Sequence, residues 1–70
     1  MDNVTARKAI GVINRQAQKK NLELLTLEEV IKMSKISGDS PKEVYKLLKN
    51  NVAYVVRIDG NLIEATVTKQ

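Results

Sequence analysis

The chain has 70 residues, with 12 lysines and arginines against 8 aspartates and glutamates, and it contains neither cysteine nor histidine. A chain of this length forms one domain with a thin core, which must be aliphatic because Tyr45 and Tyr54 are the only aromatic residues. The composition excludes disulfides and thiolate metal sites, and it removes the commonest general base and metal ligand. The net charge of +4 makes polyanions plausible partners.

The start of the sequence is polar and charged and does not resemble a signal peptide, and no apolar run is long enough to span a membrane. The lack of cysteine fits a reducing compartment. We therefore expect a cytoplasmic protein.

Residues 2–20 are predicted to form the first helix, with Asp2 or Thr5 as its cap. Its apolar residues recur at the spacing of a core-facing stripe: Ala6, Ala9, Ile10, Ile13 and Ala17. Four cations gather on the other side: Arg7, Lys8, Arg15 and Lys19. Gly11 lies on this polar side and weakens the helix slightly. The basic side could touch a nucleic-acid backbone, although a solvated helix surface is the better-supported explanation.

Asn21 can end this helix in a left-handed conformation, and the leucines of residues 22–25 are predicted to form a short strand. Thr26 and Glu29 have the spacing of a capping box and predict the start of a second helix. Gly38 is predicted to make a left-handed turn before a third helix.

Residues 40–50 carry the clearest helical signal. Ser40 can cap, Pro41 suits the first helical position, and Glu43 completes a second capping box. The helix would bury an apolar side that consists of Val44, Leu47 and Leu48. It would expose a basic side that consists of Lys42, Lys46 and Lys49, with Tyr45 at its edge. Asn50 and Asn51 are expected to end the helix, although an asparagine side chain can also read adenine.

Residues 52–58 and 62–68 are β-branched and predict a hairpin. Its turn is either Asp-Gly of type I′ or Gly-Asn of type II′, and the second choice pairs Arg57 with Glu64. Arg57 could instead reach a phosphate. Val55 and Leu62 fall on the outer face, either as single exposed residues or as part of a dimer contact.

The segment LTLEEVIKMSKISGDSPKEVYKLL resembles a helix-turn-helix unit, with Ser34, Gly38, Val44 and Leu47 at the family's spacing, and YVVRIDGNLIEATV resembles a wing. The chain thus looks like a member of the winged helix-turn-helix family. The resemblance implies an α+β fold of three helices plus a C-terminal β-hairpin wing. It places a single domain over residues 1–70, the helix-turn-helix in residues 26–50 and the wing in residues 52–68.

For function, the resemblance implies sequence-selective binding of double-stranded DNA by a transcription regulator, with the third helix in the major groove. The expected DNA contacts are Ser40, Lys42, Glu43, Tyr45, Lys46, Lys49 and Arg57. A second copy of the chain is a candidate partner, since such regulators are often dimers. Small regulators of archaea and of their viruses and plasmids look similar, and the Lys, Glu and Ile usage is compatible with a thermophile.

Two other functions use the same features. Winged helices also serve as protein-interaction adaptors, in which the lysines or the outer hairpin face would meet a partner. RNA binding is less supported, because no aromatic pair is available to stack bases. We expect no enzyme activity, cofactor, metal or small-molecule substrate, because the sequence has no paired acids, phosphate loop or activated nucleophile.

Overall fold

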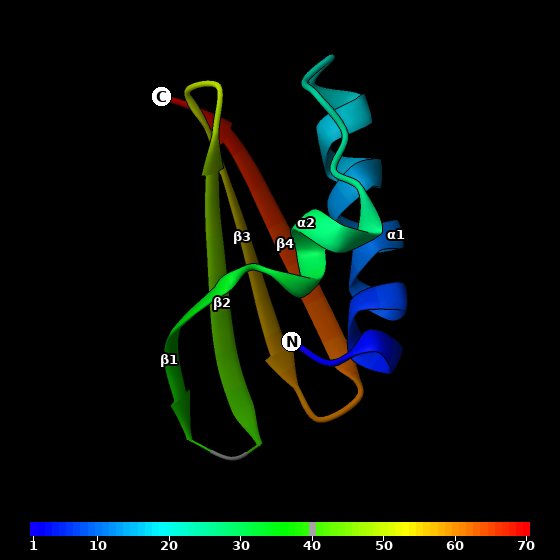
Figure 1. The fold of residues 1–70 in the computed structure, drawn as a ribbon, viewed down its shortest axis with the longest axis vertical. Coiled ribbons are helices and arrows are strands. Elements are labelled where there is room, and N and C mark those ends of the chain that lie inside the picture. Colours follow the sequence, from blue (N-terminus) through cyan, green and yellow to red (C-terminus); the bar gives the residue numbers. More distant parts are fainter. Residues whose placement is uncertain (40) are drawn as a thin grey trace.

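The computed structural model describes residues 1–39 and 41–70. Two helices, α1 (Asn3–Lys19) and α2 (Leu27–Ile31), precede four strands, β1 (Ser34–Asp39), β2 (Lys42–Lys49), β3 (Val52–Asp59) and β4 (Leu62–Lys69). The strands form one antiparallel sheet in the order β1-β2-β3-β4. Figure 1 shows both helices on the same side of the sheet, with α1 running beside β4. The fold is therefore a two-layer α+β arrangement.

The first helix forms as its sequence predicts. The Asp2 carboxylate accepts a hydrogen bond of 2.7 Å from the Thr5 amide, which caps the N-terminus. At the other end Asn21 has a φ of 55°, and the Leu22 amide donates to the Ala17 carbonyl over 2.9 Å, as in a Schellman motif. The inward stripe is fully buried and consists mainly of small residues: Ala6, Ala9, Ile13 and Ala17.

The strand predicted at residues 22–25 is wrong. The Asn14 side chain instead takes up both backbone groups of Leu25, donating to its carbonyl over 2.9 Å and accepting from its amide over 2.8 Å. The Tyr54 hydroxyl donates to the Glu23 carbonyl. Side chains thus take up both backbone groups of Leu25 and the carbonyl of Glu23, so these groups need no neighbouring strand.

The second helix starts where expected but is short. The Thr26 amide donates to Glu29 over 2.9 Å, and the Glu29 amide donates to the Thr26 hydroxyl over 3.3 Å, so the predicted capping box is confirmed. The helix ends at Ile31 and packs against α1, with Val30 buried.

The arrangement of three helices plus a hairpin wing is wrong for this chain. Residues 42–49, predicted as the recognition helix, form the strand β2, and residues 34–39, predicted as the end of one helix and a turn, form β1. The helix-turn-helix predicted over residues 26–50 is therefore absent, and what occupies this range is α2, β1 and β2. Gly38 lies within β1 and has no positive φ. The cap at Ser40 falls outside the described residues.

Residues 42–49 form a strand because they pair with strands on both sides, and the turn after them permits this pairing. Asn50 and Asn51 have φ values of 51° and 64°, so the left-handed conformation predicted for them is confirmed. Two consecutive positive φ values make a type I′ hairpin turn, whose twist suits paired strands. All eight residues of β2 pair with β3, and β2 also pairs with β1. An eight-residue helix, by contrast, would leave its first four amides and last four carbonyls without intrahelical partners.

The hairpin of β3 and β4 has the register predicted for a Gly-Asn turn. Asp59 pairs with Leu62, Arg57 with Glu64, and Gly60 has a φ of 60°. The turn is therefore of type II′. The inner side of the sheet completes the core with Tyr45, Val52, Tyr54, Val56, Ile58 and Val67. This hairpin is half of a four-stranded sheet and not a separate wing.

The two edges of the sheet are protected in different ways. The edge strand β1 is exposed throughout and carries an irregularity between Lys35 and Ser37 that breaks its register. The other edge strand, β4, is regular but lies beside α1, and the Lys20 ammonium donates to the Val67 carbonyl over 2.6 Å. Both devices discourage pairing with a further strand.

Candidate nucleic-acid interface

The residues predicted to contact DNA do not share one surface. Lys42, Lys46 and Arg57 lie on the face of the sheet that no helix covers, which we call the open sheet face. Glu43, Tyr45 and Lys49 point to the helix side, because they alternate with those residues along β2. Ser40 is outside the described residues.

The open sheet face carries both signs of charge. Asp39, Lys42 and Asp59 pair across three strands, and Arg57 pairs with Glu64 on the next row. Three cations therefore share this face with three carboxylates. Among the described residues, Arg57 and Glu64 do not come within ion-pair distance, so the predicted cross-strand ion pair does not form.

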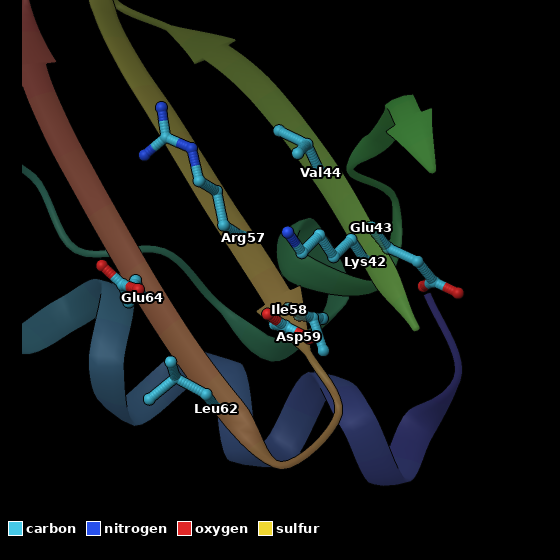
Figure 2. Close-up of a pocket in the computed structure, with 8 residues that line it drawn as sticks. All are labelled: Lys42, Glu43, Val44, Arg57, Ile58, Asp59, Leu62 and Glu64. Atoms are coloured by element: carbon cyan, nitrogen blue, oxygen red, sulfur yellow. The ribbon is translucent and has the colours of Figure 1, made fainter. Parts of the chain in front are cut away.

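A hollow of about 230 Å³ lies at one end of this face. Its lining consists of Lys42, Glu43, Val44, Arg57, Ile58, Asp59, Leu62 and Glu64. Figure 2 shows Lys42 and Arg57 projecting from the sheet, with the helices behind it. Because acidic side chains line the same hollow, it offers little net attraction to an anion.

Two of the predicted contacts are engaged within the fold. The Tyr45 side chain, in a residue only 8% exposed, donates its hydroxyl to Glu43 over 2.6 Å. This bond to a carboxylate, together with burial, raises the pKa of Tyr45 to about 12. Glu43 also lies 3.7 Å from the Lys35 ammonium. Tyr45 and Glu43 are therefore structural in this arrangement.

Lys49 is held by two carboxylates. Its ammonium lies 2.8 Å from Glu23 and 2.6 Å from Glu29, and the Asn50 amide donates to Glu23 over 2.8 Å. The two hydrogen bonds raise the pKa of Lys49 and lower the pKa of both glutamates. This cation ties β2 to the segment before α2 and is not available to a ligand.

The largest concentration of one charge is on α1. Its solvent side, which we call the α1 basic face, consists of Arg7, Lys8, Arg15 and Lys19, all exposed. No acidic residue occurs between Asn3 and Lys19. The chain has twelve cations and eight carboxylates. Without the four cations on α1, eight cations remain and equal the carboxylates in number, so the four on α1 equal the net charge of +4.

The centre of this face is recessed. Gly11 is exposed there, and a Cβ at this position would meet nothing within 4 Å. Val4, 66% exposed, lies nearly two turns before Gly11 on the same side. The α1 basic face thus combines four cations, a bare stretch of backbone and one exposed apolar side chain.

The sequence places these four cations together, but the predicted contacts were assigned to another segment. The signal that distinguishes α1 is the absence of any acidic residue over 17 positions. In residues 42–49, by contrast, Glu43 lies among the lysines. A helical segment that has several cations and no acidic residue is therefore the sequence feature that points to this face.

Other kinds of site find little support in the described part of the chain. Among residues 1–39 and 41–70, no three acidic side chains gather as they would around a metal ion. Within the same ranges, neither helix has the length and apolar character needed to cross a membrane. Comparisons with protein-family models, curated proteins and solved structures returned no match.

Proposed function

We propose that this protein binds double-stranded DNA through the α1 basic face. The observation that carries the proposal is the accumulation of the whole net charge on one exposed helix without acidic residues. Lysines and arginines that neutralise phosphates supply most of the affinity of proteins for duplex DNA. The open sheet face lacks this property because its cations and carboxylates are balanced.

The dimensions of α1 suit the major groove. A helix with its side chains is about 10–12 Å wide, and the groove is about 12 Å wide. Arg7 and Lys19 are twelve residues apart, or about 18 Å along the helix axis, so the cations are spread along the groove within reach of its flanking phosphates. Lys8 and Lys19 suit phosphates, whereas Arg7 and Arg15 suit guanine edges.

The sheet acts in this proposal as the support of the helix. Its inner side packs against Ala6, Ala9, Ile13 and Ala17, which fixes the direction of the basic side. Sequence selectivity, transcription regulation and a cytoplasmic location belong to the same proposal. The first two depend on the DNA binding itself, because base readout by Arg7 and Arg15 requires that α1 enters the groove.

The test is a salt titration of binding to a mixed-sequence duplex. Alanine substitutions at Arg7, Lys8, Arg15 and Lys19 are compared with Lys42→Ala, Lys46→Ala and Arg57→Ala, which change the charge by the same amount on the open sheet face. Lys8→Ala and Lys19→Ala should each flatten the dependence of log K on log salt by about one unit, and Arg7→Ala and Arg15→Ala should weaken binding and relax its sequence preference. The control variants should leave affinity and salt dependence nearly unchanged.

Two results would overturn the proposal. One is the absence of duplex binding at low salt, which would turn the search towards an acidic protein partner. The other is a larger loss in the open-face variants than in the α1 variants. A parallel titration with duplex RNA separates the two nucleic acids, and tighter binding to RNA would also contradict the proposal.

A further inference from the structure

Gly11 has no structural explanation within the described fold. It lies in the interior of α1, its φ is not positive, and a Cβ there would have open space around it. Glycine in the interior of a helix is destabilising relative to alanine because the unfolded chain gains freedom. Packing, a turn and a close approach to another element of the described structure therefore do not account for this residue.

The position of Gly11 on the helix is central in two senses. It is the midpoint of α1, eight residues from Asn3 and eight from Lys19. It also lies one turn from Arg7 and Lys8 on one side and one turn from Arg15 on the other, so its nearest neighbours along the exposed surface are cations. The bare backbone is thus framed by positive charge.

We propose that Gly11 is the point of closest approach between α1 and the floor of the major groove. This inference rests on the proposed function and specifies how the helix would be seated. A straight helix laid against the convex surface of a duplex comes nearest at its middle and diverges at both ends. A residue without a side chain at that middle point lets the helix backbone approach the bases closely.

A side chain at position 11 would affect the contacts of several cations at once. If a side chain occupied position 11, it would hold the helix away from the duplex, and the cations before and after it would lose their phosphates together. A second copy of α1 packing on the same glycine is disfavoured, because it would bring two sets of four cations into contact. The charge around Gly11 therefore favours a polyanion as the occupant.

The experiment compares Gly11→Ala and Gly11→Leu with Gln18→Leu, which places the same side chain on the same side of α1 but about two turns from its midpoint, where the helix diverges from the duplex. None of these substitutions changes the charge. Gly11→Ala should raise the midpoint of thermal unfolding and still weaken duplex binding, and Gly11→Leu should weaken binding by about tenfold or more and flatten the salt dependence. Gln18→Leu should bind within about twofold of wild type.

The outcomes separate this inference from the proposed function. If the wild-type chain binds no duplex, both fail. If wild type binds and Arg15→Ala weakens binding while Gly11→Leu binds like Gln18→Leu, the role of Gly11 is refuted and the proposed function stands. A fall in the unfolding temperature of Gly11→Ala would also refute it, because the glycine would then have a structural role.

Discussion

The α1 basic face and the open sheet face carry similar numbers of cations, but only the open sheet face also carries carboxylates. Four cations lie on α1 without an acid between Asn3 and Lys19, and three lie on the open sheet face among three carboxylates. Cross-strand pairing puts the two signs next to each other, as for Arg57 and Glu64. An anion is attracted by the net charge of a face, so the number of lysines alone misplaces the site.

The largest effect should come from reversing charge on α1. We expect Lys8→Glu/Lys19→Glu to weaken duplex binding about 100-fold at about 0.1 M salt, because two phosphate contacts become repulsions. The matched control is Lys42→Glu/Lys46→Glu, which changes the net charge by the same amount on the open sheet face. Equal losses in the two double variants, measured by fluorescence anisotropy, would erase the distinction between the faces.

The next largest effect should come from the attachment of α1 to the segment that follows it. Asn14→Ala removes both hydrogen bonds to Leu25 and leaves its backbone groups unpaired. We expect the free energy of unfolding to fall by about 1–3 kcal/mol. Urea denaturation measures this change, with Gln18→Ala as an exposed control on the same helix. A loss no greater than that of the control would show that Asn14 does not hold this segment.

Lys49 belongs to neither face, and its contacts with Glu23 and Glu29 predict that the free energy of unfolding depends on pH. Lys49 holds the pKa values of Glu23 and Glu29 below their ordinary value of 4.5, so the folded state binds fewer protons than the unfolded state. The resulting stabilisation is present above about pH 4.5 and is lost as the pH falls through the lowered pKa values.

Lys49→Met should therefore lower the free energy of unfolding at about pH 7 and reduce its fall between about pH 5 and pH 2. Urea denaturation across this range is the measurement, and Lys46→Met is the control from the same strand. An unchanged pH dependence in Lys49→Met would mean that the two glutamates are not coupled to this lysine in solution.

The smallest effect should come from the apolar part of the open sheet face. Val55 is only half-buried there, and Val55→Thr keeps the β-branched shape while adding a hydroxyl. We expect the free energy of unfolding to change by less than about 0.5 kcal/mol, because the face is solvated. Val56→Thr is the contrasting variant, since Val56 is fully buried. A large loss in Val55→Thr that depends on protein concentration would indicate that a second copy covers this face.

The parts of the fold that the sequence predicts are those that local chemistry decides. Asp2, Asn21 and the pair Thr26 and Glu29 mark helix ends by hydrogen bonds to neighbouring residues, and each forms as expected. The register of β3 and β4 follows from the Gly60 turn and the apolar alternation of the strands. Short-range signals of this kind do not depend on the rest of the chain.

The prediction of a helix over residues 42–49 was wrong because their apolar pattern fits both a helix and a strand. Val44, Leu47 and Leu48 suit one side of a helix, but Tyr45 and Leu47 also alternate onto the inner side of a strand. Asn50 and Asn51 do not decide between the two, because their left-handed conformation serves a helix end and a type I′ turn equally well. Since pairing with both β1 and β3 settles the choice, no window of eight residues could have predicted it.

The candidate site could be predicted only in part, because some of its features depend on long-range contacts. The cluster of Arg7, Lys8, Arg15 and Lys19 follows from helical periodicity alone, whereas the neutralisation of Lys49 requires Glu23 and Glu29 to approach from a distant segment. The balance of charge on the open sheet face depends in turn on strand order. These long-range facts decide which cations remain available.

The packing of α1 beside β4 has a consequence for how the protein is made. A ribosome synthesises α1 first among these elements, but the strand that α1 leans on is made last. Until residues 62–69 have emerged, Ile13 and the alanine stripe can pack only against α2 and β3, while the hairpin of β2 and β3 can already close through its two-residue turn. A nascent chain therefore carries its cations on a helix that still lacks its main packing partner, and the basic surface takes its final shape only after β4 has been made.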